Sequence, residues 1–457
     1  MSARAGLRGS PARWAFWAVL AGAFLLMLRL NLPGHLTVDS VLALHEGRFG
    51  VRTTWNPAFF GWLLGVLDRI HTGTALAVML SGAVLFGAWA LLPAVRGRTS
   101  WLAPVLALGL VALPQVMIYP GIVWKDVQFA VATLAGFSLL AFGVRDRLGR
   151  TPWLSLAAAA LLFAAAGLLR QNGLILALPA ALAIAWSRSA YKGWLRSAAL
   201  AVAWLATVAA LTFMLSVVAQ PQGIGAPDAA GGKGLRILQN YDLAAAAALE
   251  PGRRMPYIER ASPAAAAHLR AHAAEFYSPE RVDKMASDER MSQLWRTVPP
   301  AVARAEWFAL IRDDPALYLR ARMLAFEQVF ATPLIDSCLP VTVGVDGPPP
   351  TLEALKMTRR FDRNDQRLYN YATWYMETPA LSHVAFAAIA AVLAVLLLLR
   401  RDPADLVIAG LLAGALGFAA SFFVISIACD YRYLYLLDVA AITGLIYLAV
   451  DPRLSRR

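Results

Sequence analysis

The chain has 457 residues, of which 59% are hydrophobic and only 16% charged, and its formal net charge is +13. Soluble domains are about 45–50% apolar and about 25% charged. Because a soluble core stops growing near about 250–300 residues, this apolar excess cannot be hidden from water, and it excludes a soluble enzyme. The composition indicates a polytopic membrane protein.

The apolar runs predict about ten membrane-spanning helices, because a bilayer core of about 30 Å takes roughly 20 helical residues. In chain order the predicted spans are 13–31, 73–93, 101–119, 126–144, 152–169, 173–187, 194–218, 380–399, 405–428 and 432–450. The first run is predicted to stay as a span, since no small-x-small cleavage pattern of a signal peptide follows it. The predicted fold class is therefore an all-α polytopic membrane protein.

The basic residues predict which side of the membrane each connection faces. They fall in every second connection: Arg4, Arg8 and Arg13; Arg96 and Arg98; Arg145, Arg147 and Arg150; Arg188, Lys192 and Arg196; Arg400 and Arg401; Arg453, Arg456 and Arg457. By the positive-inside rule, these connections and both termini face the cytoplasm of a bacterial inner membrane. The net charge then reflects topology and not a nucleic-acid partner.

This orientation depends on the short apolar segment 55–71. If that segment crossed the membrane, three basic connections would lie outside. Its run of about fourteen apolar-rich residues is short for a span and suits a helix that lies in the membrane interface. We therefore predict an interfacial helix there.

Residues 220–379 are predicted to form an insert outside the cytoplasm, between an N-terminal membrane module (1–219) and C-terminal transmembrane helices (380–457). The insert contains no span and holds nineteen Lys and Arg against nineteen Asp and Glu. It begins with a Gly- and Pro-rich linker at 220–234 and is then typical of helical structure. On this topology Cys338 and Cys429 both face an oxidising compartment, where a disulfide and two unpaired side chains are both compatible with the sequence.

Acids, bases and amides gather in the predicted outer connections. In chain order these are Asp39 and Asn56, then Lys125 and Asp126, then Arg170 and Asn172, and last Tyr431 and Arg432. Solvent exposure of the loops explains any one of these polar residues. A tight turn such as LLRQNG requires no charge, however, so the density of polar residues indicates a site. Arg and Lys suit a lipid phosphate, and a nearby carboxylate suits a general base that deprotonates an acceptor.

These segments resemble the GT-C superfamily of membrane glycosyltransferases, which includes protein O-mannosyltransferases and the aminoarabinose transferase of lipid A. LTVDSVLALHEGRFG, with Asp39, matches the first outer loop of that family. WNPAFFGWLLGVLDRI matches its interfacial helices, with Asn56 where His or Pro is usual, and Asp126 of WKDVQF corresponds to an acidic residue of the second outer loop. The resemblance implies a GT-C-like fold with interfacial helices in the first outer loop and a mostly helical outer insert.

By this resemblance Asp39 is the expected catalytic base, and Lys125, Arg170 and Arg432 are expected to bind the donor phosphate. The residues expected to orient the substrate are Asp126, Asn56, Asn172 and Tyr431. Asp39 and Asp126 are also the candidate ligands of a divalent metal, Mg²⁺ or Mn²⁺, but the chain has no Asp-x-Asp motif, so metal use stays open.

The resemblance implies an inverting glycosyltransferase that moves a hexosyl or pentosyl group from a polyprenyl-phosphate-linked donor to a lipid, glycan or protein acceptor. The alternative is a transporter or flippase of lipid-linked glycans, in which the same cations would line a path through the bilayer. The charges gather on one side and no predicted span has an ionisable residue near its middle, which favours the enzyme. A non-catalytic scaffold, the third alternative, would tolerate the loss of Asp39.

Overall fold

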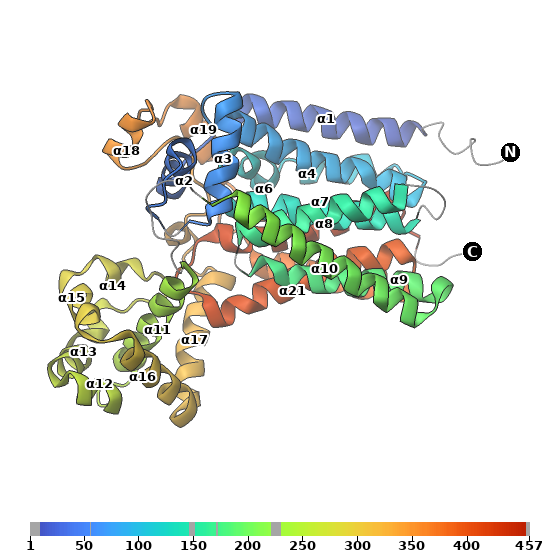
Figure 1. Ribbon diagram of the computed structural model, residues 1–457. Coiled ribbons are helices and arrows are strands. Elements are labelled where there is room, and N and C mark those ends of the chain that lie inside the picture. Colours follow the sequence, from blue (N-terminus) through green and yellow to red (C-terminus); the bar gives the residue numbers. More distant parts are fainter. Residues whose placement is uncertain (1–9, 55, 146–150, 171, 221–229, 454–457) are drawn as a thin grey trace. The chain divides into compact units, whose positions relative to one another are not determined.

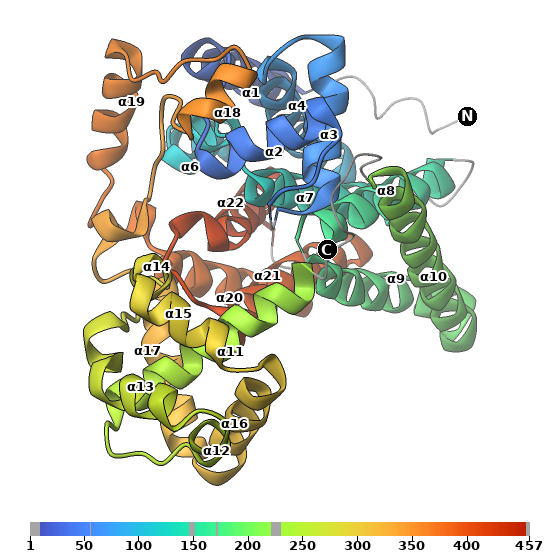
Figure 2. The same cartoon turned by 60° about the vertical axis from the view of Figure 1, so that its left-hand side comes forward.

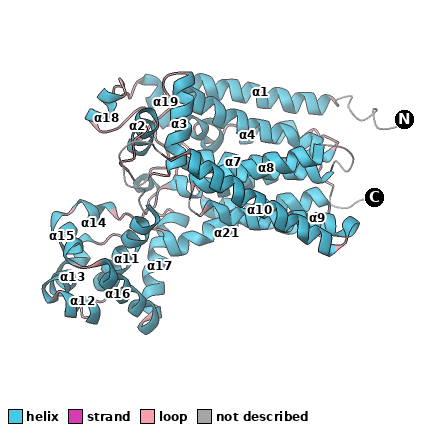
Figure 3. Cartoon of the chain, in the orientation of Figure 1, coloured by secondary structure: helices cyan, strands magenta, loops and turns pink. Residues whose placement is uncertain are grey.

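The computed structural model describes residues 10–54, 56–145, 151–170, 172–220 and 230–453. Within these ranges the chain consists of helices joined by loops (Figure 3). The described residues exclude part of the predicted linker and several predicted features, namely Arg4, Arg8, Trp55, Arg147, Arg150, Gln171, Arg456 and Arg457.

The chain divides into two compact units that differ from the predicted parts. The first unit comprises Met1–Ala226, Val341–Phe418 and Tyr435–Arg457, and the second comprises Pro227–Pro340 and Ala419–Leu434. The segment that begins at Val341 belongs to the first unit because Val345 forms a parallel bridge with Leu36. The insert predicted as 220–379 is thus shared between the two units.

The apolar helices of the first unit are α1 (Pro11–Asn31), α4 (Ala75–Arg96), α5 (Leu102–Leu110), α6 (Pro114–Met117), α7 (Lys125–Arg145), α8 (Thr151–Leu169), α9 (Ala177–Lys192), α10 (Trp194–Val218), α20 (His383–Arg400) and α22 (Tyr435–Val450). Helix α21 (Pro403–Ile425) begins in this unit and ends in the second. The remaining helices are α2 (Val38–Phe49), α3 (Ala58–Ile70), α18 (Pro349–Ala354) and α19 (Arg363–Thr373), and three short 3₁₀ turns are η2 (Tyr119–Gly121), η3 (Gly173–Leu176) and η5 (Pro379–Leu381).

Seven helices of the described chain are long and apolar enough to cross a membrane, which confirms an all-α polytopic protein. They are α1, α4, α7, α10, α20, α21 and the stretch Tyr431–Val450 that contains α22. The apolar stretches Trp153–Leu169 and Gly173–Ser187, which lie in α8 and in η3 with α9, are shorter. Each predicted span thus coincides with apolar helix, although fewer than ten helices have spanning length.

The predicted span 101–119 is not one straight helix. Helix α5 and the segment Pro114–Gly121 form a pair bent by 84°, so together they count as at most one further span. The bend falls before Pro114, because the ring of a proline disfavours helical backbone in the preceding residue. Leu113 accordingly has extended backbone, with φ −70° and ψ 144°.

Helix α7 forms the centre of the first unit. Its spanning stretch is 89% buried, and α4, α8 and α22 pack against it, whereas the spanning stretch of α10 is only 17% buried. Helices α1, α4 and α7 run side by side, and α3 runs across their direction (Figure 1), as Figure 2 shows from another side. A helix of 13 residues that crosses the others suits the predicted interfacial position.

Arginine–aspartate pairs join the helices at the end of the unit where α4 ends. Arg96 lies 3.0 Å from Asp405 and 3.0 Å from Asp451, and Arg400 lies 3.1 Å from Asp405. These contacts join α4, α20, α21 and the residue that follows α22. Buried charges in a membrane protein require such partners, so the cluster stabilises the packing of this end.

Three glycines allow α2 and α3 to touch through their backbones. A Cβ atom on Gly47 would lie 2.0 Å from the carbonyl oxygen of Gly61, and one on Gly65 would lie 2.3 Å from the carbonyl oxygen of Gly47. No real side chain fits these distances. The two helices therefore form a tight hairpin that returns the chain from Asp39 to Asn56.

The second unit is a helical assembly with a buried ion pair. Its helices are α11 (Ala230–Leu249), α12 (Pro256–Ala261), α13 (Pro263–Phe276), α14 (Asp283–Ser287), α15 (Glu289–Thr297), α16 (Pro300–Asp313) and α17 (Pro315–Phe330), with 3₁₀ turns η4 (Ile335–Cys338) and η6 (Tyr431–Leu434). Arg322 lies 2.8 Å from Asp242, and both side chains are fully buried. Arg322 also donates to the carbonyls of Val424 and Ser426 at 2.9 Å, so it joins α11, α17 and the segment 419–434.

A disulfide joins Cys338 and Cys429, which decides between the two alternatives that the sequence leaves open. The bond connects η4 to the segment after α21 within the second unit. A main-chain hydrogen bond ties the same segment to the loop between α13 and α14, because Cys429 N–H donates to the carbonyl of Glu280 at 2.9 Å. Disulfides persist in oxidising compartments, which is consistent with an insert outside the cytoplasm.

The α2–α3 contact gives a test of the fold. We expect Gly47→Ala to lower stability by about 1–3 kcal/mol, because the added methyl must push two backbones apart. Gly22→Ala in α1 is the control, since its Cβ would meet nothing within 4 Å and alanine favours a helix. Thermal unfolding of the purified protein in detergent measures both. Equal stability of the two variants would contradict the tight contact.

Candidate functional site

Main-chain pairing positions Asp39 beside the start of α7. His35 N–H donates to the carbonyl of Gly121 at 2.9 Å, and Val123 N–H donates to the carbonyl of His35 at 3.0 Å. The Ser40 hydroxyl then donates to the carbonyl of Val123 at 2.6 Å. Since Lys125 is only two residues further along, this pairing brings the first turn of α2 to the first turn of α7.

Asp39 lies in the first turn of α2 and is partly exposed. The N-terminal end of a helix carries partial positive charge, which favours a negative side chain there. A carboxylate in this position has the charge that a general base needs, and the role of Asp39 as the base stays a prediction.

A buried histidine, His35, joins several segments of this region. His35 Nδ1 accepts from the N–H of Gly344 at 3.0 Å, and its Nε2 lies 3.1 Å from Oδ1 of Asn31. The Asn31 amide donates to the carbonyls of Met27 and Met117 at 2.7 and 2.8 Å, so its Oδ1 is the acceptor for a protonated Nε2. These partners fit the neutral imidazole with its proton on Nε2.

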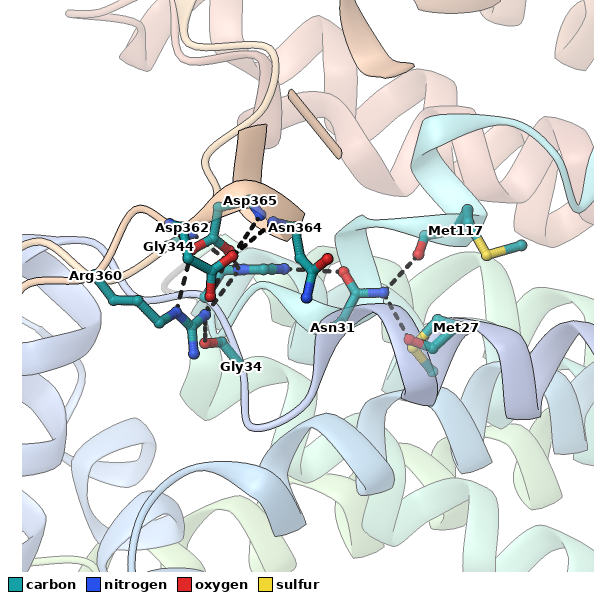
Figure 4. A network of polar contacts seen from close by, with 10 residues as sticks. Met27, Asn31, Gly34, Met117, Gly344, Arg360, Asp362, Asn364 and Asp365 are labelled. Atoms are coloured by element: carbon teal, nitrogen blue, oxygen red, sulfur yellow. Dashed lines mark hydrogen bonds and ion pairs between the residues drawn. The ribbon is translucent and has the colours of Figure 1, made fainter. Parts of the chain in front are cut away.

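Charged groups surround this histidine from the segment that begins at Val341. Asp365 lies 3.5 Å from His35 Nδ1. Arg360 lies 3.2 Å from Asp365 and donates to the carbonyl of Gly34 at 3.1 Å (Figure 4). Burial lowers the pKa of His35 to about 4, and the positive Arg360 also lowers it, while Asp365 and Asp362 act in the opposite direction. The imidazole is therefore neutral at physiological pH.

Gly121 lets the two paired segments approach. A Cβ there would lie 2.3 Å from the Cβ of Asn31, so no larger residue fits between η2 and the end of α1. Leu36 pairs with a second segment, Gly344–Asp346. Its N–H donates to the carbonyl of Gly344, and its carbonyl accepts from the N–H of Asp346, both at 2.9 Å. The backbone before α2 is thus held from both sides.

Asn56 connects the α2–α3 hairpin with the cation of α7. Its side-chain amide donates to the main-chain carbonyl of Asp39 at 3.1 Å, and its Oδ1 accepts from Nζ of Lys125 at 3.2 Å. Asn56 is 1% exposed and Lys125 is 9% exposed. The structure thus brings together three of the predicted site residues, from three segments of the sequence.

Buried Asp126 and half-buried Arg170 form an ion pair next to this group. Nη1 of Arg170 contacts Oδ1 of Asp126, and its guanidinium lies 5.6 Å from the centre of the Phe418 ring. Gly173 makes the turn before η3 possible, because a Cβ there would lie 2.8 Å from both Phe129 and the carbonyl of Ala166. Arg170 thus has Asp126 as an ion-pair partner, in addition to its predicted role at a phosphate.

The other predicted residues lie in two places. Asn172 directly precedes η3 in the first unit and is half-buried. Tyr431 and Arg432 belong to the second unit, where both are buried and Arg432 lies 3.1 Å from Asp430. Arg281 lies 3.1 Å from the other oxygen of Asp430. The roles of Tyr431 and Arg432 at the donor stay predictions.

Asp39 and Asp126 are the predicted metal ligands. Within the ranges that the structure describes, no group of three or more His, Cys, Asp and Glu side chains is arranged to hold a metal ion. Asp126 instead contacts Arg170. A divalent metal at Asp39 and Asp126 stays a prediction.

No protein-family model matches this chain, and no curated protein matches it. Among solved structures it is similar to the oligosaccharyltransferase AglB of Archaeoglobus fulgidus in complex with an inhibitory peptide and a dolichol-phosphate. The identity is 15%, the TM-score is 0.41, and the match covers 96% of this chain and 50% of AglB. The chain thus spans about half the length of AglB.

Two further solved structures are similar to the chain. ArnT of Cupriavidus metallidurans bound to undecaprenyl phosphate has 15% identity and a TM-score of 0.37, with 96% of this chain and 78% of ArnT covered. The arabinosyltransferase EmbB of Mycobacterium smegmatis has 17% identity and a TM-score of 0.35, with 96% and 42% covered. These similar structures are GT-C glycosyltransferases, as the sequence resemblance indicates.

The sequence did not single out the residues that support Asp39. Asn31 ends a predicted span, and Arg360 and Asp365 lie more than 300 positions further along the chain. His35 is four positions before Asp39 and carried the clearest available signal, a histidine just after a span. Its partners are apparent only in the folded backbone.

The neutral His35 gives a pH-dependent prediction. Its pKa in the folded protein, about 4, lies below the ordinary value of 6.5, so the unfolded chain binds more protons between these values. The stability that His35 contributes is therefore fully present above about pH 6.5 and is lost as the pH falls toward about 4. We expect His35→Gln to flatten the fall of the unfolding temperature between about pH 7 and pH 5. A variant with the same pH slope as the wild type would contradict the neutral buried imidazole.

Proposed function

We propose that this protein is a membrane glycosyltransferase that transfers a sugar from a polyprenyl-phosphate carrier to an acceptor outside the cytoplasm. The observation that carries the proposal is the connection of Asp39 through Asn56 to Lys125, with the Asp126–Arg170 pair beside it. In this proposal the carboxylate of Asp39, a residue that is partly exposed, acts together with the cation of Lys125. General-base chemistry and binding of a phosphate need these two groups.

In the proposed reaction the carboxylate of Asp39 takes the proton of an acceptor hydroxyl. The acceptor oxygen forms a bond to the anomeric carbon of the sugar while the bond from that carbon to the phosphate oxygen breaks. The electron pair of the broken bond leaves with the carrier, which departs as polyprenyl phosphate. Lys125 stabilises the negative charge that develops on that phosphate. A single displacement of this kind inverts the anomeric configuration, and hexosyl and pentosyl donors are both suitable.

The membrane context supports a carrier lipid as the donor. The candidate residues come from the connections at the ends of apolar helices, where a lipid phosphate lies at the level of the head groups. The disulfide in the second unit supports an oxidising environment for the insert. The positive-inside rule supports an orientation with both termini in the cytoplasm, in a bacterial inner membrane.

Asp39→Asn is the direct test of the enzyme. We expect turnover with a labelled polyprenyl-phosphate-linked sugar to fall at least about 100-fold, because an amide of the same shape cannot accept the proton. The control is Asp346→Asn, which removes an exposed carboxylate from the same unit and should leave turnover unchanged. Full turnover in Asp39→Asn would remove Asp39 as the base. Movement of the intact lipid-linked glycan across vesicles, without sugar transfer, would support the transporter instead.

The orientation has its own test. The two native cysteines form a disulfide and no cysteine is free, so a single introduced thiol can be labelled alone. Thr72 and Arg98 are exposed and flank α4 at its two ends. We expect an impermeant maleimide to label Thr72→Cys from outside the cell and Arg98→Cys only after the membrane is opened. The reverse pattern would overturn the outward position of Asp39.

A further inference from the structure

A basic groove lies on the α2–α3 hairpin, at the opposite end of α2 from Asp39. Its volume is about 560 Å³, within the range of small-ligand sites. The walls come from the end of α2, the loop after it, α3 and the end of α10, and include Arg48, Arg52, Arg69, Phe49, Trp62 and Val218. Asp39 and Arg48 are nine positions apart on the helix, which corresponds to about 13 Å along its axis.

The three arginines of the groove have different surroundings. Arg48 is bound to Asp68 by two contacts of 2.6 and 2.8 Å, so it joins α2 to α3. Arg52 and Arg69 form no ion pair in the described part of the chain, and they are half-buried and exposed respectively. Two guanidinium groups therefore remain available to an anion.

The acid of the groove is already engaged with the backbone. Glu46 is 5% exposed, and its Oε1 accepts from the N–H groups of Thr53 and Thr54 at 2.7 and 2.6 Å. These bonds close the loop that carries Arg52. Glu46 thus shapes the groove, and its charge is directed toward main-chain donors.

One wall of the groove is apolar. Phe49 is 50% exposed, and Trp62, Val51 and Val218 also line the space. Aromatic side chains beside arginines at the ends of membrane helices suit an amphiphile whose head group meets the cations and whose chain runs along the apolar wall. A free inorganic anion would use only half of this surface.

We propose that this groove binds the phosphate head group of a membrane lipid, with Arg52 and Arg69 on the phosphate and Trp62 and Phe49 along the chain. Arginine binds phosphate through paired hydrogen bonds, which suits the two available guanidinium groups. The lipid is a glycerophospholipid, because the groove lies at the opposite end of α2 from Asp39, where the polyprenyl carrier is proposed to react.

The test uses the full-length protein in phosphatidylcholine nanodiscs that contain a photoreactive phosphatidic acid. We expect crosslinks on peptides that contain Trp62 or Val218. The double variant Arg52→Gln/Arg69→Gln should lower the crosslinking yield at least about tenfold, because both charged donors are lost. The matched control is Arg363→Gln/Arg367→Gln, which removes two exposed arginines from α19 and should keep the yield.

Competition identifies the ligand. Unlabelled phosphatidic acid should displace the probe more strongly than undecaprenyl phosphate does. Stronger displacement by undecaprenyl phosphate would overturn the glycerophospholipid assignment. Equal displacement by inorganic phosphate would overturn the lipid assignment. Equal loss of yield in both double variants, or crosslinks only elsewhere, would overturn the groove as a site. Wild-type unfolding temperatures in both variants show that the fold is intact.

Discussion

The arrangement of the candidate site depends on a short main-chain pairing around His35 and Leu36. This segment lies between Gly121–Val123 and Gly344–Asp346, and each side supplies backbone hydrogen bonds of about 2.9–3.0 Å. Because buried backbone groups need partners, such pairing helps to hold a connection without regular secondary structure in one position. The neutral imidazole of His35 adds two hydrogen bonds at the centre and places no charge there.

Close backbone contacts extend this constraint to the catalytic candidates. Gly121 lets η2 approach Asn31, and Gly47 lets α2 approach α3, so both contacts are fixed by the absence of a side chain. The hairpin then returns Asn56 to the carbonyl of Asp39, and Asn56 reaches Lys125. A site on connections becomes rigid in this way, and rigid positioning is the condition that catalysis by oriented groups requires.

The sequence predicted the features that depend on local pattern and missed those that depend on long-range pairing. Apolar length located α1, α7 and α22, because burial in a bilayer depends mainly on composition. The bend before Pro114 was missed, since the apolar run continues through it. Arg170 was predicted as a phosphate ligand, but spacing cannot reveal that Asp126, 44 positions away, contacts it. The same holds for Asp242 and Arg322, whose buried pair joins helices 80 residues apart.

The charges of the first-unit candidates explain why an acid and cations belong in one site. Before the reaction the formal charges sum to zero over Asp39, Lys125, Asp126 and Arg170. In the proposed transfer the carrier phosphate gains one negative charge as the bond to the sugar breaks, while Asp39 loses its own charge by accepting the acceptor proton. The summed formal charge of the four protein groups therefore rises by one, while the charge of the leaving phosphate becomes more negative by one. In the proposed reaction this exchange stabilises the transition state more than the bound donor, and only such differential stabilisation accelerates a reaction.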